Sequence, residues 1–179
     1  MPPINRDIER YDATTIFLHW LTVIMVAALW LGGQTIDWFP RGPLRVDARS
    51  VHITLGLSLS LVVVGRLVWR VSWGRDLPPA GVGPLAVASR AMHRVLYALL
   101  AAMMLVGMLL VWTRGASIFG QFTIPASAPG NRALAHQVQE IHGDIGWAIL
   151  AMASLHTLGA LYHRYRLHDG VLGRMLPRG

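Results

Sequence analysis

The chain has 179 residues, of which 54% are hydrophobic and only 14% are charged. A soluble domain of this size carries more charge, so the composition indicates a membrane protein. Cysteine is absent, which excludes disulfides, thiolate metal sites and covalent attachment of a cofactor through a C-x-x-C-H motif. The net charge of +7 comes from an excess of arginine alone, since the chain has no lysine.

Four apolar segments are each long enough to cross a bilayer, and little of the chain is left over for a separate soluble domain. We expect one membrane domain over residues 1–179, folded as an all-α bundle of four transmembrane helices. The first residues mix arginines with acidic residues and show no cleavage site, so the first segment is expected to remain as a spanning helix. The segments are predicted at about 14–34, 52–73, 90–112 and 140–163.

The connections between these segments are rich in proline and glycine. After the first segment, the stretch FPRGPLR (39–45) holds two prolines and one glycine, which predict a turn and no helix. A loop of residues 76–84 joins the second and third segments. A longer, irregular connection of residues 113–139 precedes the fourth, with room for a short helix before His142. No alternation typical of strands is evident.

The arginines predict the orientation of the bundle. Eleven of the sixteen fall in three regions on one side of the membrane, and five fall on the other. Because cytoplasmic loops carry an excess of basic residues, both termini are expected in the cytoplasm. The cytoplasmic set is Arg6, Arg10, Arg66, Arg70, Arg75, Arg90, Arg94, Arg164, Arg166, Arg174 and Arg178, and the outer set is Arg41, Arg45, Arg49, Arg114 and Arg132.

Two histidines of the fourth segment, His142 and His156, are fourteen residues apart. On an α-helix this spacing is about 21 Å of rise and about four turns, so both imidazoles project from nearly the same face at opposite sides of the bilayer core. His52 lies at the depth of His142, whereas His19 and His93 lie at the depth of His156. Ionisable side chains within a membrane are costly and usually functional.

These outer and inner histidine layers predict two haems stacked across the membrane, each held non-covalently between two imidazoles. The outer haem has one available pair, His52 with His142. The inner haem has three candidates, His19, His93 and His156, for two positions. The residues alone leave that choice open.

Small residues near these histidines support the same prediction. Gly56 and Gly146 each follow an outer histidine by four residues, so they share its helix face and leave a bare patch for a flat macrocycle. Ala153 and Ala160 flank the inner His156 in the same way. The alternative is close helix packing through small-xxx-small contacts.

The histidines and methionines also allow other interpretations. Embedded histidines could bind Zn²⁺ or relay protons, but a closed zinc site gathers its ligands around one ion, and a relay usually includes a buried acid. His168 is expected to be an interfacial anchor, His136 to be solvated, and His163 to be an anchor or part of a polar pocket. Methionines 103, 104 and 108 are expected to pack in the core.

The outer arginines form the second predicted feature. Arg41, Arg45 and Arg49 fall within eleven residues of His52, and Arg114 follows the third segment and can reach the same rim. A positive rim beside the outer haem would attract a small anion and raise its encounter rate. The alternative is pairing with haem propionates, and both roles are expected among these residues.

Six motifs together resemble the bacterial cytochrome b561 family, most closely its superoxide oxidase members, over about residues 15–177. The resemblance implies that His19 pairs with His156 at the inner haem and that His52 pairs with His142 at the outer one. It also implies a quinone pocket at His93 with His163 nearby, where a histidine can bond a carbonyl or pass protons. The motifs are LHWL (18–21), FPRGPLR (39–45), HRVLY (93–97), RGASIFGQFTIP (114–125), IHGDIG (141–146) and GRMLPR (173–178).

The resulting hypothesis is a di-haem b oxidoreductase of the bacterial inner membrane. Superoxide would give an electron to the outer haem by outer-sphere transfer, and ubiquinone would be reduced on the cytoplasmic side. A second hypothesis is an electron-transfer subunit or anchor for a periplasmic dehydrogenase or c-type cytochrome, with the arginine rim docking an acidic protein. A histidine-based proton or metal transporter is the third.

Overall fold

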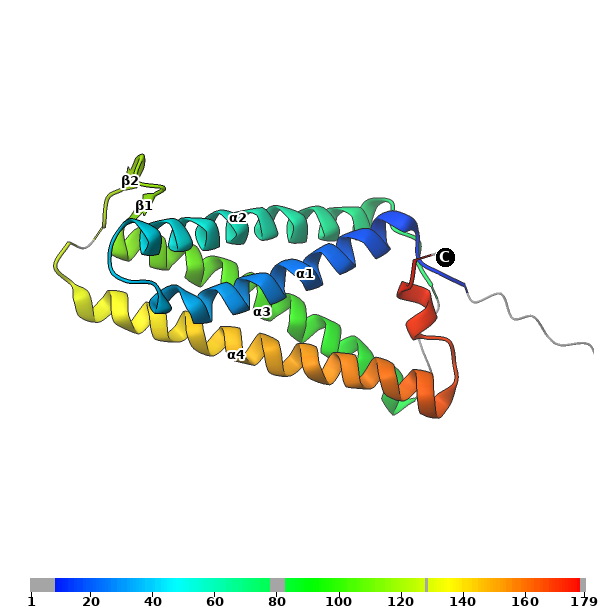
Figure 1. Ribbon diagram of the computed structural model, residues 1–179. Coiled ribbons are helices and arrows are strands. Elements are labelled where there is room, and N and C mark those ends of the chain that lie inside the picture. Colours follow the sequence, from blue (N-terminus) through cyan, green and yellow to red (C-terminus); the bar gives the residue numbers. More distant parts are fainter. Residues whose placement is uncertain (1–8, 78–82, 128, 178–179) are drawn as a thin grey trace, which may run out of the picture.

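The computed structural model describes residues 9–77, 83–127 and 129–177, and four long helices dominate it (Figure 1). Each helix is long and apolar enough to cross a membrane, so the predicted four-helix transmembrane bundle is confirmed. The helices are α1 (Ala13–Thr35), α2 (Pro43–Ser72), α3 (Pro84–Arg114) and α4 (Arg132–Tyr162). Arg6, Arg178 and part of the predicted loop 76–84 lie outside the described residues.

The start of α2 differs from its prediction. The helix begins at Pro43 and not near residue 52, because Pro43 occupies the first turn, where a helix N–H has no partner and proline is favoured. Gly42 precedes it with φ +141°, a conformation that favours glycine. The same Gly-Pro pattern starts α3 at Pro84, six residues before the predicted boundary. The proline-rich stretch therefore begins a helix and does not exclude one.

The outer connection is more ordered than its sequence suggests. A β-hairpin pairs β1 (Ala116–Ile118) with β2 (Phe122–Ile124), and α4 begins at Arg132, eight residues before the predicted start. Three-residue strands are too short to show an alternating pattern, so the sequence did not reveal them. The buried Ser50 on α2 accepts a hydrogen bond from the Phe119 N–H at 2.8 Å and fastens the hairpin to the bundle.

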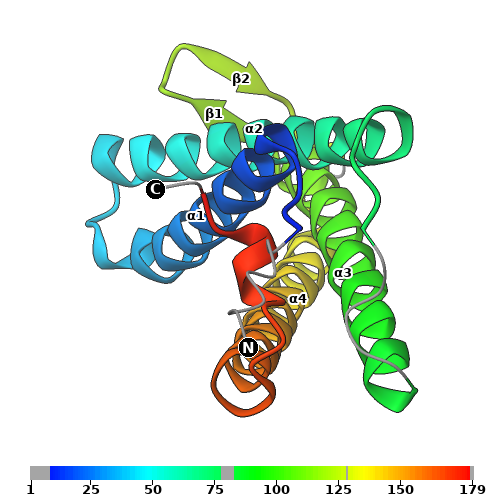
Figure 2. The same cartoon turned by 90° about the vertical axis from the view of Figure 1, so that its right-hand side faces the viewer.

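The four helices pack as two pairs, α1 against α2 and α3 against α4, with fewer contacts between the pairs. Figure 2 shows this arrangement along the bundle. A small core of Leu59, Val63, Leu100 and Ile149 joins α2, α3 and α4. Most other apolar side chains face outward, as expected for helices surrounded by lipid tails.

The C-terminal segment folds back over the end of the bundle. After α4, the π-helical turn η2 (His163–Leu167) and the 3₁₀ turn η3 (Leu172–Met175) lead back toward α1. The indole N–H of Trp20 donates to the carbonyl of Met175 at 2.8 Å, and the N–H of Tyr11 donates to the carbonyl of Arg174 at 3.1 Å. The first and last described residues therefore lie at the same end, opposite the hairpin (Figure 1). A further 3₁₀ turn, η1 (Ile36–Trp38), follows α1.

Candidate functional site

The outer layer brings together His52 of α2 and His142 of α4. Their ring centroids are 6.2 Å apart and their planes are inclined by 71°. Because α2 and α4 belong to different helix pairs, the two imidazoles face each other across the boundary between the pairs. Two rings that bind one iron from opposite sides, through bonds of about 2 Å, would have centroids about 6 Å apart. The observed separation fits such a group.

Each outer histidine is half-buried, and its Nδ1 atom is buried without a hydrogen-bond partner. Unpaired polar atoms are rare inside proteins and call for an explanation. A group bound at Nε2 of each ring would explain why two imidazoles are buried at this position. The orphaned atoms and the ring separation together make the outer layer suitable for a bis-imidazole haem.

Two glycines of the neighbouring helices make room for these rings. A Cβ added at Gly33 of α1 would lie 3.3 Å from Cε1 of His52, and one added at Gly107 of α3 would lie 3.3 Å from Cε1 of His142. Sequence reasoning missed both glycines. They could have been found from the sequence, because each is a glycine in an apolar segment at the same membrane depth as the outer histidines.

The glycines singled out from the sequence behave differently. A Cβ added at Gly56 would meet nothing within 4 Å, and one at Gly146 would meet only the Met103 methyl at 3.5 Å. Neither residue is therefore required by the packing of a histidine ring. The space beside Gly56, on the helix of His52, is compatible with a flat group, and its role remains a prediction.

The inner layer consists of three histidines near the C-terminal end of α4. His19 of α1 lies 6.4 Å from His156 between ring centroids, with planes inclined by 71°, nearly the geometry of the outer pair. His93 of α3 lies closer to His156, at 5.1 Å. Since α4 is unbroken from Arg132 to Tyr162, this layer is about 21 Å along the helix from the outer one. Within each predicted layer the histidines therefore lie side by side, and both inner candidates, His19 and His93, lie next to His156.

A half-buried arginine completes the inner layer. Nη2 of Arg66 lies 3.1 Å from Nδ1 of His19, and its guanidinium lies 5.5 Å from the centroid of the Tyr97 ring. From its position in the sequence, Arg66 is expected only to contribute to the cytoplasmic positive charge. The spacing of residues could have placed Arg66 in the inner layer, because Arg66 follows His52 by fourteen residues, as His156 follows His142. The same four-turn interval carries α2 and α4 from one layer to the other.

The remaining histidines lie away from the two layers. Nδ1 of His163 is hydrogen-bonded to the carboxylate of Asp169, and no described contact joins His163 to His93. His136 is exposed, and its Nδ1 lies 3.5 Å from Oε2 of the exposed Glu140. His168 is exposed and has a left-handed backbone with φ +52°.

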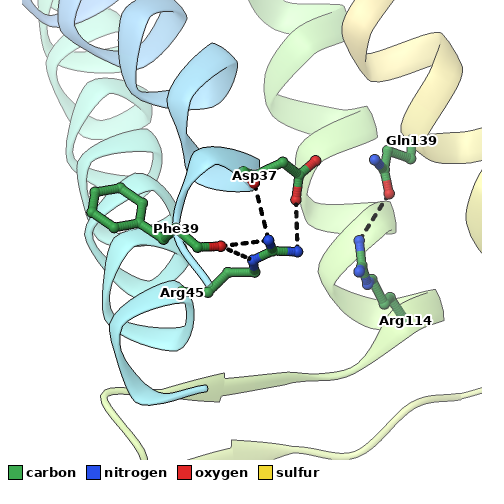
Figure 3. Close-up of polar contacts among 5 residues, drawn as sticks. All are labelled: Asp37, Phe39, Arg45, Arg114 and Gln139. Carbon is green, nitrogen blue, oxygen red and sulfur yellow. Dashed lines mark hydrogen bonds and ion pairs between the residues drawn. The ribbon is translucent and has the colours of Figure 1, made fainter. Parts of the chain in front are cut away.

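Arg45 and Arg114 of the outer rim are engaged in different ways (Figure 3). Nε of Arg45 donates to the Phe39 carbonyl at 2.8 Å, and Nη2 donates to the Asp37 carbonyl at 3.0 Å. Nη1 also forms an ion pair with the Asp37 carboxylate at 3.3 Å. Arg45 therefore holds the turn between α1 and α2. Arg114 instead donates to the side chain of Gln139 at 2.8 Å.

The structure gathers three of the four predicted rim arginines. The charge of the half-buried Arg49 interacts with those of Arg114, Asp37 and Arg45, whereas Arg41 is exposed and has no ion pair among the described residues. Arg114 lines a cleft of about 350 Å³, and the polar residues Arg132, His136 and Gln139 also line it. The rim thus presents positive charge and an open cleft above the outer histidine pair.

A four-helix membrane bundle with facing imidazoles at two depths is the architecture of a membrane cytochrome b. Residues 10–178 match the model of the family described as prokaryotic cytochrome b561. The chain therefore belongs to the cytochrome b561 family. It is a membrane electron-transfer protein from a family that binds b-type haem.

Three relatives span nearly the whole chain. Cytochrome b561 homolog 1 of Escherichia coli K12 is 30% identical, covering 95% of this chain and 98% of its own. Cytochrome b561 homolog 2 of the same organism is 29% identical, covering 95% and 93%. A protein of Yersinia pestis named probable superoxide oxidase CybB is 25% identical, covering 95% and 97%.

Proposed function

We propose that this protein is a superoxide:ubiquinone oxidoreductase of the bacterial inner membrane. His52 with His142, and His19 with His156, would hold two b-type haems, which supply one-electron transfer between the two sides of the membrane when bound. The observation that carries the proposal is the near-identity of the two pairs, whose ring centroids are 6.2 and 6.4 Å apart at two depths of α4. The name of the Yersinia pestis relative supports the substrate.

The outer rim would collect the anion. Arg49 and Arg114 supply positive charge, and the acidic side chain that interacts with Arg49, Asp37, is paired with Arg45. The unneutralised charge would raise the local concentration of a small anion such as superoxide. If His52 and His142 both hold the haem iron, they leave no place for the anion on the metal, so these arginines would act by attraction and orientation.

The inner end would serve the quinone. His93 is exposed on α3, where a lipid-dissolved quinone can reach it. Its Nδ1 lies 2.7 Å from the Ser89 carbonyl, so Nδ1 carries the proton and Nε2 is a free acceptor for a quinol hydroxyl. His163, held by Asp169, is the second candidate for proton transfer. In the balanced reaction, two superoxide anions become two molecules of O₂, and one quinone takes up two electrons and two protons.

The test is stopped-flow mixing of purified full-length protein with superoxide. Haem reduction should follow second-order kinetics, disappear when superoxide dismutase is added, and reverse on addition of a soluble ubiquinone. Arg114→Gln should slow the rate about threefold or more and weaken its salt dependence. Arg90→Gln makes the same charge change at the other end of α3 and is the control. Intact haem that superoxide does not reduce would rule out the substrate.

A second function is favoured by one observation. The β-hairpin projects from the outer end beside α2 (Figure 1) and exposes Phe119 and Phe122, the latter with 64% of its surface accessible. Exposed aromatic side chains beside a basic rim are typical of protein docking sites. The chain would then be a cytochrome b subunit or anchor for a periplasmic dehydrogenase or c-type cytochrome. Co-purification of a stoichiometric acidic partner would favour this function over the first.

A further inference from the structure

The chain reverses sharply after α4 and borders an open cleft at the end of the bundle opposite the outer rim. The π-helical turn η2 ends at His168, whose left-handed backbone turns the chain toward η3. The cleft has a volume of about 390 Å³. Its lining residues are Arg164, Tyr165, His168, Gly170, Leu172 and Gly173.

The arginine of this cleft, Arg164, has no ion-pair partner among the residues that the structure describes. Asp169 is the adjacent carboxylate, but it accepts hydrogen bonds from His163 Nδ1 and from the Val171 N–H, the latter at 3.2 Å. Partial burial alone would raise its pKa, but these hydrogen bonds lower it below the usual value, so Asp169 stays ionised and engaged.

The cleft also combines charge with apolar surface at the membrane boundary. The Arg164 guanidinium lies 5.8 Å from the centroid of the Tyr165 ring, which is 69% exposed, and the apolar Leu172 also lines the cleft. Arginine and tyrosine at the end of a spanning helix lie at the level of lipid headgroups. Basic residues at that level attract anionic lipids.

We propose that this cleft binds the phosphate group of an anionic phospholipid in the leaflet at this end of the bundle. Arg164 donates charged hydrogen bonds to the phosphate, and His168 lies within the same cleft as a second donor. Tyr165 and Leu172 contact the less polar glycerol region. This site is separate from the histidine layers and does not depend on the proposed electron donor or acceptor.

The test is lipid titration of the full-length purified protein by native mass spectrometry, with phosphatidylglycerol against phosphatidylcholine. Arg164→Gln should weaken phosphatidylglycerol binding about fivefold and leave phosphatidylcholine unchanged. Arg166→Gln is the matched control, because it removes the same charge from the same turn but does not line the cleft. It should change binding less than twofold. Arg164→Lys, which keeps the charge, should retain most of the affinity. This variant shows whether a loss in Arg164→Gln comes from the missing charge or from misfolding.

Soluble competitors separate a lipid from a free phosphate. Inorganic phosphate and glycerol phosphate, added at millimolar concentration, should not displace phosphatidylglycerol. Displacement by either compound would assign the cleft to a soluble anion and overturn the lipid proposal. Equal losses in Arg164→Gln and Arg166→Gln would also overturn it, since they would show general attraction to the surface and no built site.

Discussion

The guanidinium of Arg66 donates a hydrogen bond to Nδ1 of His19, with 3.1 Å between the two nitrogens. Arginine has no acceptor, so Nδ1 carries the lone pair and the proton of the neutral ring is on Nε2. A histidine that binds a metal through Nε2 must carry its proton on Nδ1 instead. The contact therefore holds His19 in the tautomer that does not bind iron through Nε2.

His93 shows the opposite tautomer. Its Nδ1 donates to the Ser89 carbonyl at 2.7 Å, the arrangement that metal-binding histidines commonly use to orient the ring. Ring separation favours His19 as partner of His156, whereas hydrogen bonding favours His93. If His19 is the ligand, haem binding requires Arg66 to release Nδ1, and its charge is then free for an anionic group such as a propionate.

The inner ligand can be identified by haem content. We predict that His19→Ala lowers the content from two haems per chain to about one, whereas His93→Ala retains both, because the His19–His156 separation matches that of the outer pair. Haem is measured by the pyridine haemochrome assay and the reduced-minus-oxidised spectrum. The reverse result would show that His93 binds iron and that the Arg66 contact is permanent.

The outer pair and the space beside it give a second prediction. Gly56→Val should reduce outer haem content by half or more, because the added methyl groups would fill the face that the macrocycle needs, although nothing in the protein opposes them. Gly65→Val is the control, since Gly65 lies on the same helix and its Cβ would also meet nothing within 4 Å. Equal haem content in the two variants, measured by Soret absorbance per chain, would exclude this role for Gly56.

The contacts of Arg45 predict a role in stability. Arg45→Gln removes hydrogen bonds to Phe39 and Asp37 and an ion pair on a partly exposed turn, which should lower the free energy of unfolding by about 1 kcal/mol. Thermal unfolding in detergent is the measurement. Arg41→Gln, which has no ion pair among the described residues, should leave the melting temperature unchanged. If both variants melt like the wild type, the turn does not depend on Arg45.

Asp12 provides a pH-dependent prediction. Its carboxylate accepts hydrogen bonds from Thr15, the Trp69 indole and the Arg75 N–H, joining the start of α1 to the end of α2. Partial burial alone would raise its pKa, but these hydrogen bonds lower it from 3.8 to about 2. Because the folded pKa is the lower one, the stabilisation is complete above about pH 4 and is lost as the pH falls toward 2.

Asp12→Asn should therefore destabilise the protein by about 1–2 kcal/mol at neutral pH. The difference in melting temperature from the wild type should shrink between pH 4 and pH 2. Asp76→Asn is the control, because Asp76 is exposed and its one ion pair among the described residues is with Arg70. A difference that stays constant over this range would show that the charge of Asp12 contributes nothing.

The sequence by itself determined the four membrane spans and the two histidine layers. Apolar length sets which segments enter a bilayer, and helical periodicity sets depth, so His142 and His156 could be placed from their spacing alone. Helix starts were less predictable. At Pro43, the same residue that breaks a helix interior favours a first turn, and only the chain that follows distinguishes the two.

Only the tertiary structure decided which side chains meet across helices. The room that Gly33 leaves for His52, the contact of Arg66 with His19, and the anchoring of the hairpin at Ser50 each join residues distant in the chain. Such contacts depend on how each helix is rotated about its axis and on which helices pair. Helix rotation and pairing follow from packing over the whole bundle, which no local pattern of residues specifies.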